Sequence, residues 1–188
     1  TGFNEGYLWS NTGDFSGDGK LDYVFGYENS GTSVSFNLNG ISAGTVTNSS
    51  FTKYSKYNQG YGNTVLVDVD GDGKPDLVTG VAYSNNTYML NVVHNISTGP
   101  GSITFAPVVT LTSVGYYPYG GICLGDINGD GKLDIITSNQ NISLGLSVYL
   151  NTSVTGTIST NSFGSAVILA NSGVNTQGVA VGDIDGDG

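Results

Sequence analysis

The chain has 188 residues and a formal net charge of −10, with 15 acidic residues against five lysines and no arginine. This charge argues against a nucleic-acid partner, because neutralising phosphates requires clustered Lys and Arg. The one cysteine excludes an intrachain disulfide, and no apolar run is long enough to span a membrane.

Almost all of the acidic charge lies in four copies of one short motif. Residues 68–76 read DVDGDGKPD, residues 14–22 read DFSGDGKLD, and residues 126–134 read DINGDGKLD. The fourth copy, residues 183–188, contains only DIDGDG. The first Asp of each copy follows the previous one by 54, 58 and 57 residues, so the sequence is that of a repeat protein.

The spacing of oxygen donors in this motif is that of a calcium loop. Side chains at positions 1, 3, 5 and 9 and the backbone carbonyl at position 7 supply the oxygens that Ca²⁺ prefers, and Gly at position 6 permits the turn. We expect Ser16 to bind through water and to weaken the first site. Four bound Ca²⁺ would change the formal charge from −10 to −2. The predicted ligands are Asp14, Ser16, Asp18, Lys20 and Asp22; Asp68, Asp70, Asp72, Lys74 and Asp76; Asp126, Asn128, Asp130, Lys132 and Asp134; and Asp183, Asp185 and Asp187 of the truncated fourth site.

The residues between the loops carry strand patterns and no helical periodicity. Short apolar runs at 64–67, 121–124 and 179–181 precede a loop, and β-branched or aromatic runs at 23–25, 77–79 and 135–137 follow one. The polar stretch 8–12 predicts an irregular or exposed strand before the first loop. Alternating apolar residues predict a third strand, half buried, at 34–38, 88–92 and 146–150, and a fourth strand is expected to contain Phe51, Phe105 and Phe163.

Four short antiparallel strands per repeat describe the blade of an all-β propeller, with the calcium loop between the first and second strands. The predicted repeats are 1–54, 55–112, 113–169 and a partial one at 170–188, which together form one segment of about three and a third blades. Propellers close with four to eight blades. We therefore expect the remaining blades to come from a longer chain, or the missing strands to come from a neighbouring subunit.

The motif, the following β run, the strand end at 148–151 and the Phe of the last strand resemble the FG-GAP or VCBS repeats of integrin α propellers, some fungal lectins and secreted microbial proteins. The resemblance covers the whole chain. It implies a calcium-stabilised, extracellular or cell-surface propeller used for binding, adhesion or carbohydrate recognition. Two alternatives remain: a structural subunit of a surface or filament assembly, and a propeller attached to a secreted polysaccharide-active enzyme.

No catalytic residue is predicted, because the aspartates are committed to calcium and the remaining reactive side chains stand far apart in sequence. We expect His94 to be a partly exposed structural residue and Cys123 a buried thiol. Ligand candidates are Tyr57, Tyr116 and Tyr117, in connections opposite the calcium turns. Five Asn-x-Ser/Thr sequons, about as many as chance gives, allow glycosylation at Asn48, Asn85, Asn95, Asn141 and Asn151.

Overall fold

The computed structural model describes residues 9–27, 32–37, 53–58, 63–82, 88–99, 103–112, 121–139, 145–169, 176 and 178–184. Between residues 24 and 58 it describes the backbone alone. The described residues form three four-stranded sheets, which we call blades 1, 2 and 3. Blade 1 contains β1 (Trp9–Gly13), β2 (Asp22–Tyr27), β3 (Thr32–Asn37) and β4 (Lys53–Asn58); blade 2 contains β5 (Thr64–Val67), β6 (Asp76–Ala82), β7 (Tyr88–Val93) and β8 (Val109–Thr112); blade 3 contains β9 (Ile122–Gly125), β10 (Asp134–Ser138), β11 (Leu146–Tyr149) and β12 (Val167–Leu169).

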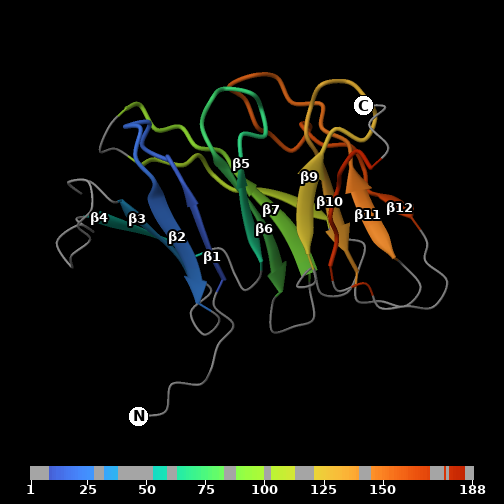
Figure 1. Cartoon of the computed structure of the whole chain (residues 1–188), viewed down its shortest axis with the longest axis horizontal. Coiled ribbons are helices and arrows are strands. Elements are labelled where there is room, and N and C mark those ends of the chain that lie inside the picture. The colour runs from blue at the N-terminus through green and yellow to red at the C-terminus, as the bar shows by residue number, and fades with distance from the viewer. Residues whose placement is uncertain are drawn as a thin grey trace, which may run out of the picture.

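The predicted all-β class and the four-stranded antiparallel sheet are confirmed. Strands follow one another across each sheet in sequence order, so every blade is a meander. The part of the chain that the structure describes contains no helix, and hence none long and apolar enough to cross a membrane. In Figure 1 the loops between the first and second strands of the three blades lie along the same, upper edge of the molecule. The repeat in sequence is therefore a repeat in space.

Several predicted boundaries change. The polar stretch at the start forms the regular strand β1, with Ser10 and Thr12 exposed. β8 ends at Thr112 and β12 at Leu169, but β4 runs to Asn58, so the first repeat extends past the predicted end at residue 54. The sequence could not locate that end, because polar turn residues and the polar strand β4 have similar compositions.

The expectation that Phe105 and Phe163 lie in fourth strands is wrong. Each forms an isolated bridge, with Asn95 and Asn151 respectively, and the fourth strands β8 and β12 begin only afterwards. The ring of Phe105 instead packs edge-on against Phe15 of the first loop, with centroids 6.0 Å apart and planes at 70°. Phe51, the third residue of this set, lies outside the described residues.

The third strands of blades 2 and 3 are offset by two residues relative to their loops. Leu77, the first residue after its loop, pairs with Val93, whereas the corresponding Ile135 pairs with Tyr149. Counting from the loop therefore misaligns these strands, because the paired residues Leu77 and Val93 are 16 positions apart along the hairpin of blade 2, whereas Ile135 and Tyr149 are 14 positions apart in blade 3. The third strands β7 and β11, which the alternation predicted to be half buried, are instead buried at every position except Met89 and Leu146, which are partly exposed.

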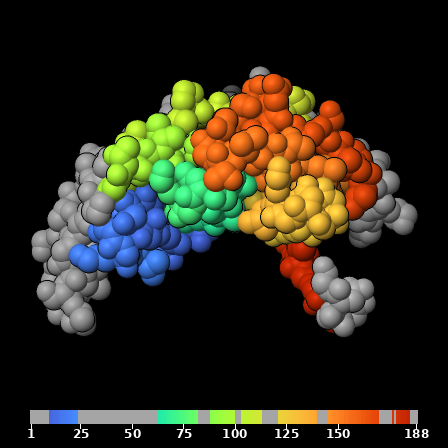
Figure 2. Space-filling view, turned by 90° about the horizontal axis from the view of Figure 1, so that it is seen from above, coloured from blue at the N-terminus to red at the C-terminus, as the bar shows by residue number. Residues whose placement is uncertain are grey.

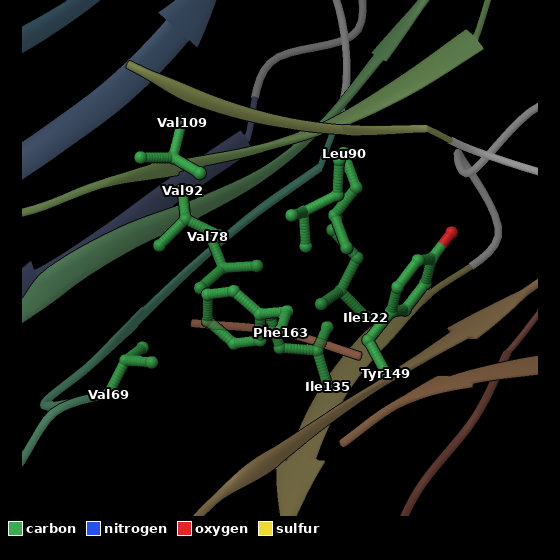
Figure 3. Packing of buried hydrophobic residues seen from close by; sticks show 10 residues of the cluster. Val69, Val78, Leu90, Val92, Val109, Ile122, Ile135, Tyr149 and Phe163 are labelled. Atoms are coloured by element: carbon green, nitrogen blue, oxygen red, sulfur yellow. The ribbon is translucent and has the colours of Figure 1, made fainter. Parts of the chain in front are cut away.

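The hydrophobic cores lie between blades. Val78, Leu90, Val92 and Val109 of blade 2 face Ile122, Ile135, Tyr149 and Phe163 of blade 3, as Figure 3 shows. Leu111 belongs to the same cluster. Figure 2 shows the blades following one another along a curved row. The first and second loops also supply their second residue to the core of the next blade: Phe15 packs with Leu77, Val93 and Phe105, and Val69 packs in the cluster with Ile135, Tyr149 and Phe163.

Residues 178–184 begin to repeat this arrangement beside blade 3. A Cβ added to Gly125 would lie 2.6 Å from Val181 Cγ1, and one added to Gly13 would lie 3.7 Å from Leu66 Cδ1. Gly13 and Gly125 each stand directly before a loop, and Leu66 and Val181 each stand two residues before the next loop. The predicted strand at 179–181 thus occupies the place of a fourth blade's first strand, although the described residues there are not in regular strand geometry.

Candidate metal centres

The first aspartate of each loop is the point around which the loop folds. Asp68 Oδ1 accepts hydrogen bonds from the N–H groups of Gly71 and Asp72, and Oδ2 accepts one from Gly73, at 2.8, 3.0 and 2.8 Å. Gly71 and Gly73 have φ angles of 74° and 86°, a conformation that side-chain-bearing residues rarely adopt. Asp126 receives the equivalent three bonds, and Asp14 receives two of them.

The ninth residue closes each loop from inside the protein. Asp22, Asp76 and Asp134 are all fully buried. Asp76 accepts hydrogen bonds from the N–H groups of Val69 and Asn95, at 3.0 and 2.8 Å, and Asp134 accepts the equivalent bonds from Ile127 and Asn151. This carboxylate therefore ties the start of its own loop to the segment that follows the third strand.

The carboxylates of the second loop converge on a common point. Oxygens of Asp68, Asp70 and Asp76 all lie within 4.8 Å of one another. Two unit charges at that distance repel by about 3.5 kcal/mol at an effective dielectric of 20, so the arrangement needs a cation or protons. Asp70 Oδ2 and, in the first loop, Asp22 Oδ1 are buried without a hydrogen-bond partner. Unpaired carboxylate oxygens of this kind fit a hard cation, so the predicted ligands can hold one.

Burial dominates the proton affinity of these carboxylates. It raises the pKa of Asp22 and Asp70 above the ordinary value, and it raises that of Asp76 to about 7 despite the hydrogen bonds from Asn95 and Val69. Asp126 lies on the surface, and the N–H groups of Gly131 and its neighbours lower its pKa. Burial therefore shifts the proton equilibrium of Asp22, Asp70 and Asp76 toward the neutral form.

The third position differs among the loops, as the sequence indicated. Ser16 is buried, and its hydroxyl oxygen has no hydrogen-bond partner. Asn128 is exposed; its amide oxygen accepts a hydrogen bond from Asp130 N, and its amide nitrogen donates one to Asp130 Oδ2. The first two loops each contain buried residues, Phe15 and Ser16 in the first and Val69 and Asp70 in the second, whereas residues 126–131 of the third loop are exposed.

His94, expected to be a partly exposed structural residue, is in fact buried against the second loop. Its Nε2 lies 3.2 Å from Asp70 Oδ2 and 3.7 Å from Asp72 Oδ2, and one donor atom from each of these three residues belongs to a common cluster. The contact does not have hydrogen-bond geometry, so Nε2 remains unpartnered. This contact could not be predicted from the sequence, because His94 is far from the loop in the chain and the equivalent residue in blade 3 is Leu150.

Asn95 and Asn151 connect consecutive loops, a role that the sequence analysis missed. The amide nitrogen of Asn95 donates to Pro75 O in its own loop and to Phe15 O in the preceding loop, both at 3.1 Å. Asn151 makes the same bridge to Leu133 O and Val69 O, at 3.0 and 2.8 Å. The signal in the sequence was an Asn-x-Ser repeated at the end of the third strand, where each Asn oxygen accepts from the Ser N–H.

These bridges correct the expectation of glycosylation at Asn95 and Asn151. Both side chains are fully buried, and both amide nitrogens are occupied by two carbonyl groups. A glycan on either nitrogen is incompatible with this packing. The other candidates, Asn48, Asn85 and Asn141, lie outside the described residues, as do Tyr116, Tyr117, Asp185, Asp187 and the side chain of Tyr57.

The family model of the FG-GAP-like repeat matches residues 14–79 and 68–137. Each match begins at the first aspartate of a loop and ends in the strand that follows the next loop, so it spans one complete step between adjacent blades. No curated protein and no solved structure matches the chain. The two matches together cover more than half of the sequence, and the chain belongs to the FG-GAP-like repeat family.

Proposed function

We propose that the chain is part of an extracellular β-propeller that calcium stabilises and that serves in binding, adhesion or carbohydrate recognition. The observation that carries the calcium assignment is the pair of buried, unpartnered carboxylate oxygens, Asp22 Oδ1 and Asp70 Oδ2, in loops whose other donors are oxygens. Bound calcium would supply a central charge that offsets the repulsion among the carboxylates. The residues that would hold it are the predicted ligands at positions 1, 3, 5, 7 and 9.

Calorimetric titration of chelator-stripped full-length chain tests the calcium assignment. We expect one Ca²⁺ for each of the three complete loops. The second and third sites should bind more tightly than the first, because Ser16 replaces a stronger ligand there. Equal affinities would remove the argument about position 3, and no detectable binding would overturn the calcium role.

A larger ring is favoured by the face of blade 3 that points away from blade 2. Ile127, Val167 and Leu169 there are 49, 49 and 50% exposed, whereas the equivalent Val69, Val109 and Leu111 of blade 2 are 3, 8 and 7% exposed because blade 3 covers them. The unpaired face thus repeats an apolar surface that is buried one blade earlier. We propose that another blade covers it, supplied by a longer chain or by a neighbouring subunit.

The replacement Ile127→Ala tests this in the full-length protein. If a further blade covers the residue, urea denaturation should show a loss of about 2–4 kcal/mol, similar to the loss for Val69→Ala. A loss under about 0.5 kcal/mol for Ile127→Ala, with the larger loss retained for Val69→Ala, would mean that this face stays open to solvent.

Two features support the binding role: the location of the calcium loops at one edge of the molecule, and the chemistry of the tyrosine side chains. The calcium loops occupy one edge of the molecule in Figure 1, and we assign recognition to the tyrosines that the sequence puts in other connections, Tyr57, Tyr116 and Tyr117. A tyrosine offers a flat apolar face and a hydroxyl group, as sugars and partner loops require. The binding role is supported if the protein binds a glycan array and the triple Tyr→Ala variant does not. Self-association of the purified protein without ligand binding supports the filament alternative. A catalytic domain in the full-length gene supports the enzyme-linked alternative.

A further inference from the structure

His94 brings a nitrogen donor to a loop whose other donors are oxygens. It follows β7, is 7% exposed, and directs Nε2 at Asp70 Oδ2 from 3.2 Å. Neither of these two buried atoms has a hydrogen-bond partner. Asp72 Oδ2 lies 3.7 Å from the same nitrogen, and donor atoms of the three residues lie within 4.8 Å of one another. The cluster is therefore more than a group of acidic residues: it contains a buried imidazole nitrogen with no other partner.

The distances suit a small four-coordinate cation. Zn²⁺ binds imidazole nitrogen and carboxylate oxygen at about 2.0–2.1 Å, so donor atoms of a tetrahedral site stand about 3.3 Å apart. The two distances from His94 Nε2, 3.2 and 3.7 Å, lie on either side of that value. Calcium takes oxygen ligands almost exclusively, whereas imidazole suits zinc and the neighbouring transition metals.

We propose that Asp70, Asp72 and His94 form a mixed nitrogen–oxygen site in the second loop that takes Zn²⁺ in preference to Ca²⁺. The fourth ligand is water, because the site opens to a pocket of about 560 Å³ between the first and second loops. Asp72, Lys74 and His94 line this pocket together with Ser16 and Gly17. A hydrated ion in this pocket can therefore reach Asp72 and His94, and the third donor, Asp70 Oδ2, lies 3.2 Å from the His94 nitrogen.

The ammonium group of Lys74 forms an ion pair with one of the proposed ligands. Its ammonium nitrogen lies 3.2 Å from Asp72 Oδ2, the same oxygen that faces His94. The lysine side chain is 39% exposed, so it can turn into solvent when a divalent ion takes its place. The site then exchanges one positive charge for two against the same pair of carboxylates.

The third blade provides an internal comparison. The pairing of Leu77 with Val93 and of Ile135 with Tyr149 makes Leu150 the equivalent of His94. Asn128 stands where the second loop has Asp70. The third loop therefore keeps the calcium motif but lacks two of the three proposed zinc ligands, and only the second loop is expected to select zinc.

The first experiment titrates the full chain with Zn²⁺ in a background of about 1 mM Ca²⁺, using Cys123→Ser protein so that the one thiol cannot bind the metal. Because the sequence contains one histidine, its imidazole NMR signals come from His94 alone. We expect one equivalent of Zn²⁺ to shift these signals. His94→Leu, which copies blade 3, should lose about 100-fold in Zn²⁺ affinity while keeping the calcium stoichiometry. Unmoved signals, or unchanged Zn²⁺ affinity in His94→Leu, would overturn the proposal.

A gain-of-site variant keeps the proposal testable if His94→Leu does not fold. Leu150→His combined with Asn128→Asp rebuilds the same donor set on the third loop and should bind a second Zn²⁺; failure of the folded variant to do so would count against the proposed geometry. The inference rests on the second loop being a metal loop, yet the two ideas can fail separately. Calcium binding without zinc binding rejects only the zinc site, whereas absence of both rejects the calcium role as well.

Discussion

The side-chain bridge between consecutive loops should be one of the largest single contributions to stability. Asn151 is fully buried, and its amide nitrogen donates to Val69 O and Leu133 O, at 2.8 and 3.0 Å. Asn151→Asp keeps the volume of the side chain but replaces two donors with an acceptor that faces two carbonyl oxygens. Each buried carbonyl group left without a partner costs about 1–3 kcal/mol.

We therefore expect Asn151→Asp to lower the free energy of unfolding by about 3–5 kcal/mol. For a chain of this size, that corresponds to a fall in Tm of roughly 6–20 °C. Urea denaturation and thermal melts in saturating Ca²⁺, followed by tyrosine fluorescence, measure both quantities. Asn95→Asp should behave alike, because Asn95 makes the same two bonds in the preceding blade.

The control is Asn161→Asp, the same chemical change at an exposed position in the connection between β11 and β12. It should alter the free energy of unfolding by less than about 0.5 kcal/mol. If Asn151→Asp also stays within that limit, the two carbonyl groups find other partners and the bridge does not hold adjacent loops together.

Three further predictions follow from the loops. In EDTA, the buried Asp76 binds its proton more tightly in the folded than in the unfolded chain, because its pKa is raised from 3.8 to about 7. The free energy of unfolding should therefore fall by about 4 kcal/mol as the pH rises from about 4 to about 7, and Asp76→Asn should lack this fall. Equal pH dependence in both proteins would contradict the assignment. Asp72→Ala should remove one calcium and, at a Ca²⁺ concentration about a thousand times the Kd, about 4 kcal/mol of stabilisation; a melt within a degree or two of the parent in Ca²⁺ would deny the loop its stabilising role. Phe15→Ala should cost about 3–5 kcal/mol in urea denaturation, because the fully buried ring fills the space beside Phe105, and a cost below about 1 kcal/mol would show that the two blades are not held together there.

The sequence alone determined the repeat, the loop and the strand order within a blade. These features depend on local rules: the alternation of oxygen donors around Gly71 and Gly73 requires a turn of one shape, and the β-branched runs beside it can pair only as the two arms of that turn. The register of β5 with β6 follows from the length of the loop between them, so the pairing of the first two strands of each blade could be predicted from the sequence.

Only the tertiary structure decided how one blade meets the next. Asn95 reaches Phe15 O across 80 positions of sequence, and His94 reaches Asp70 across a turn whose length differs from that of the neighbouring blade. Neither of these long-range contacts produces a periodic pattern in the sequence. The Asn-x-Ser pattern has the same residues as a glycosylation sequon, although here the Asn side chain accepts a hydrogen bond from the Ser N–H group and forms a turn. Phe105 is buried outside a strand because it packs against the loop of another blade. The sequence does not reveal such contacts, because the hydrophobic core lies between sheets and contains residues that are distant in the chain.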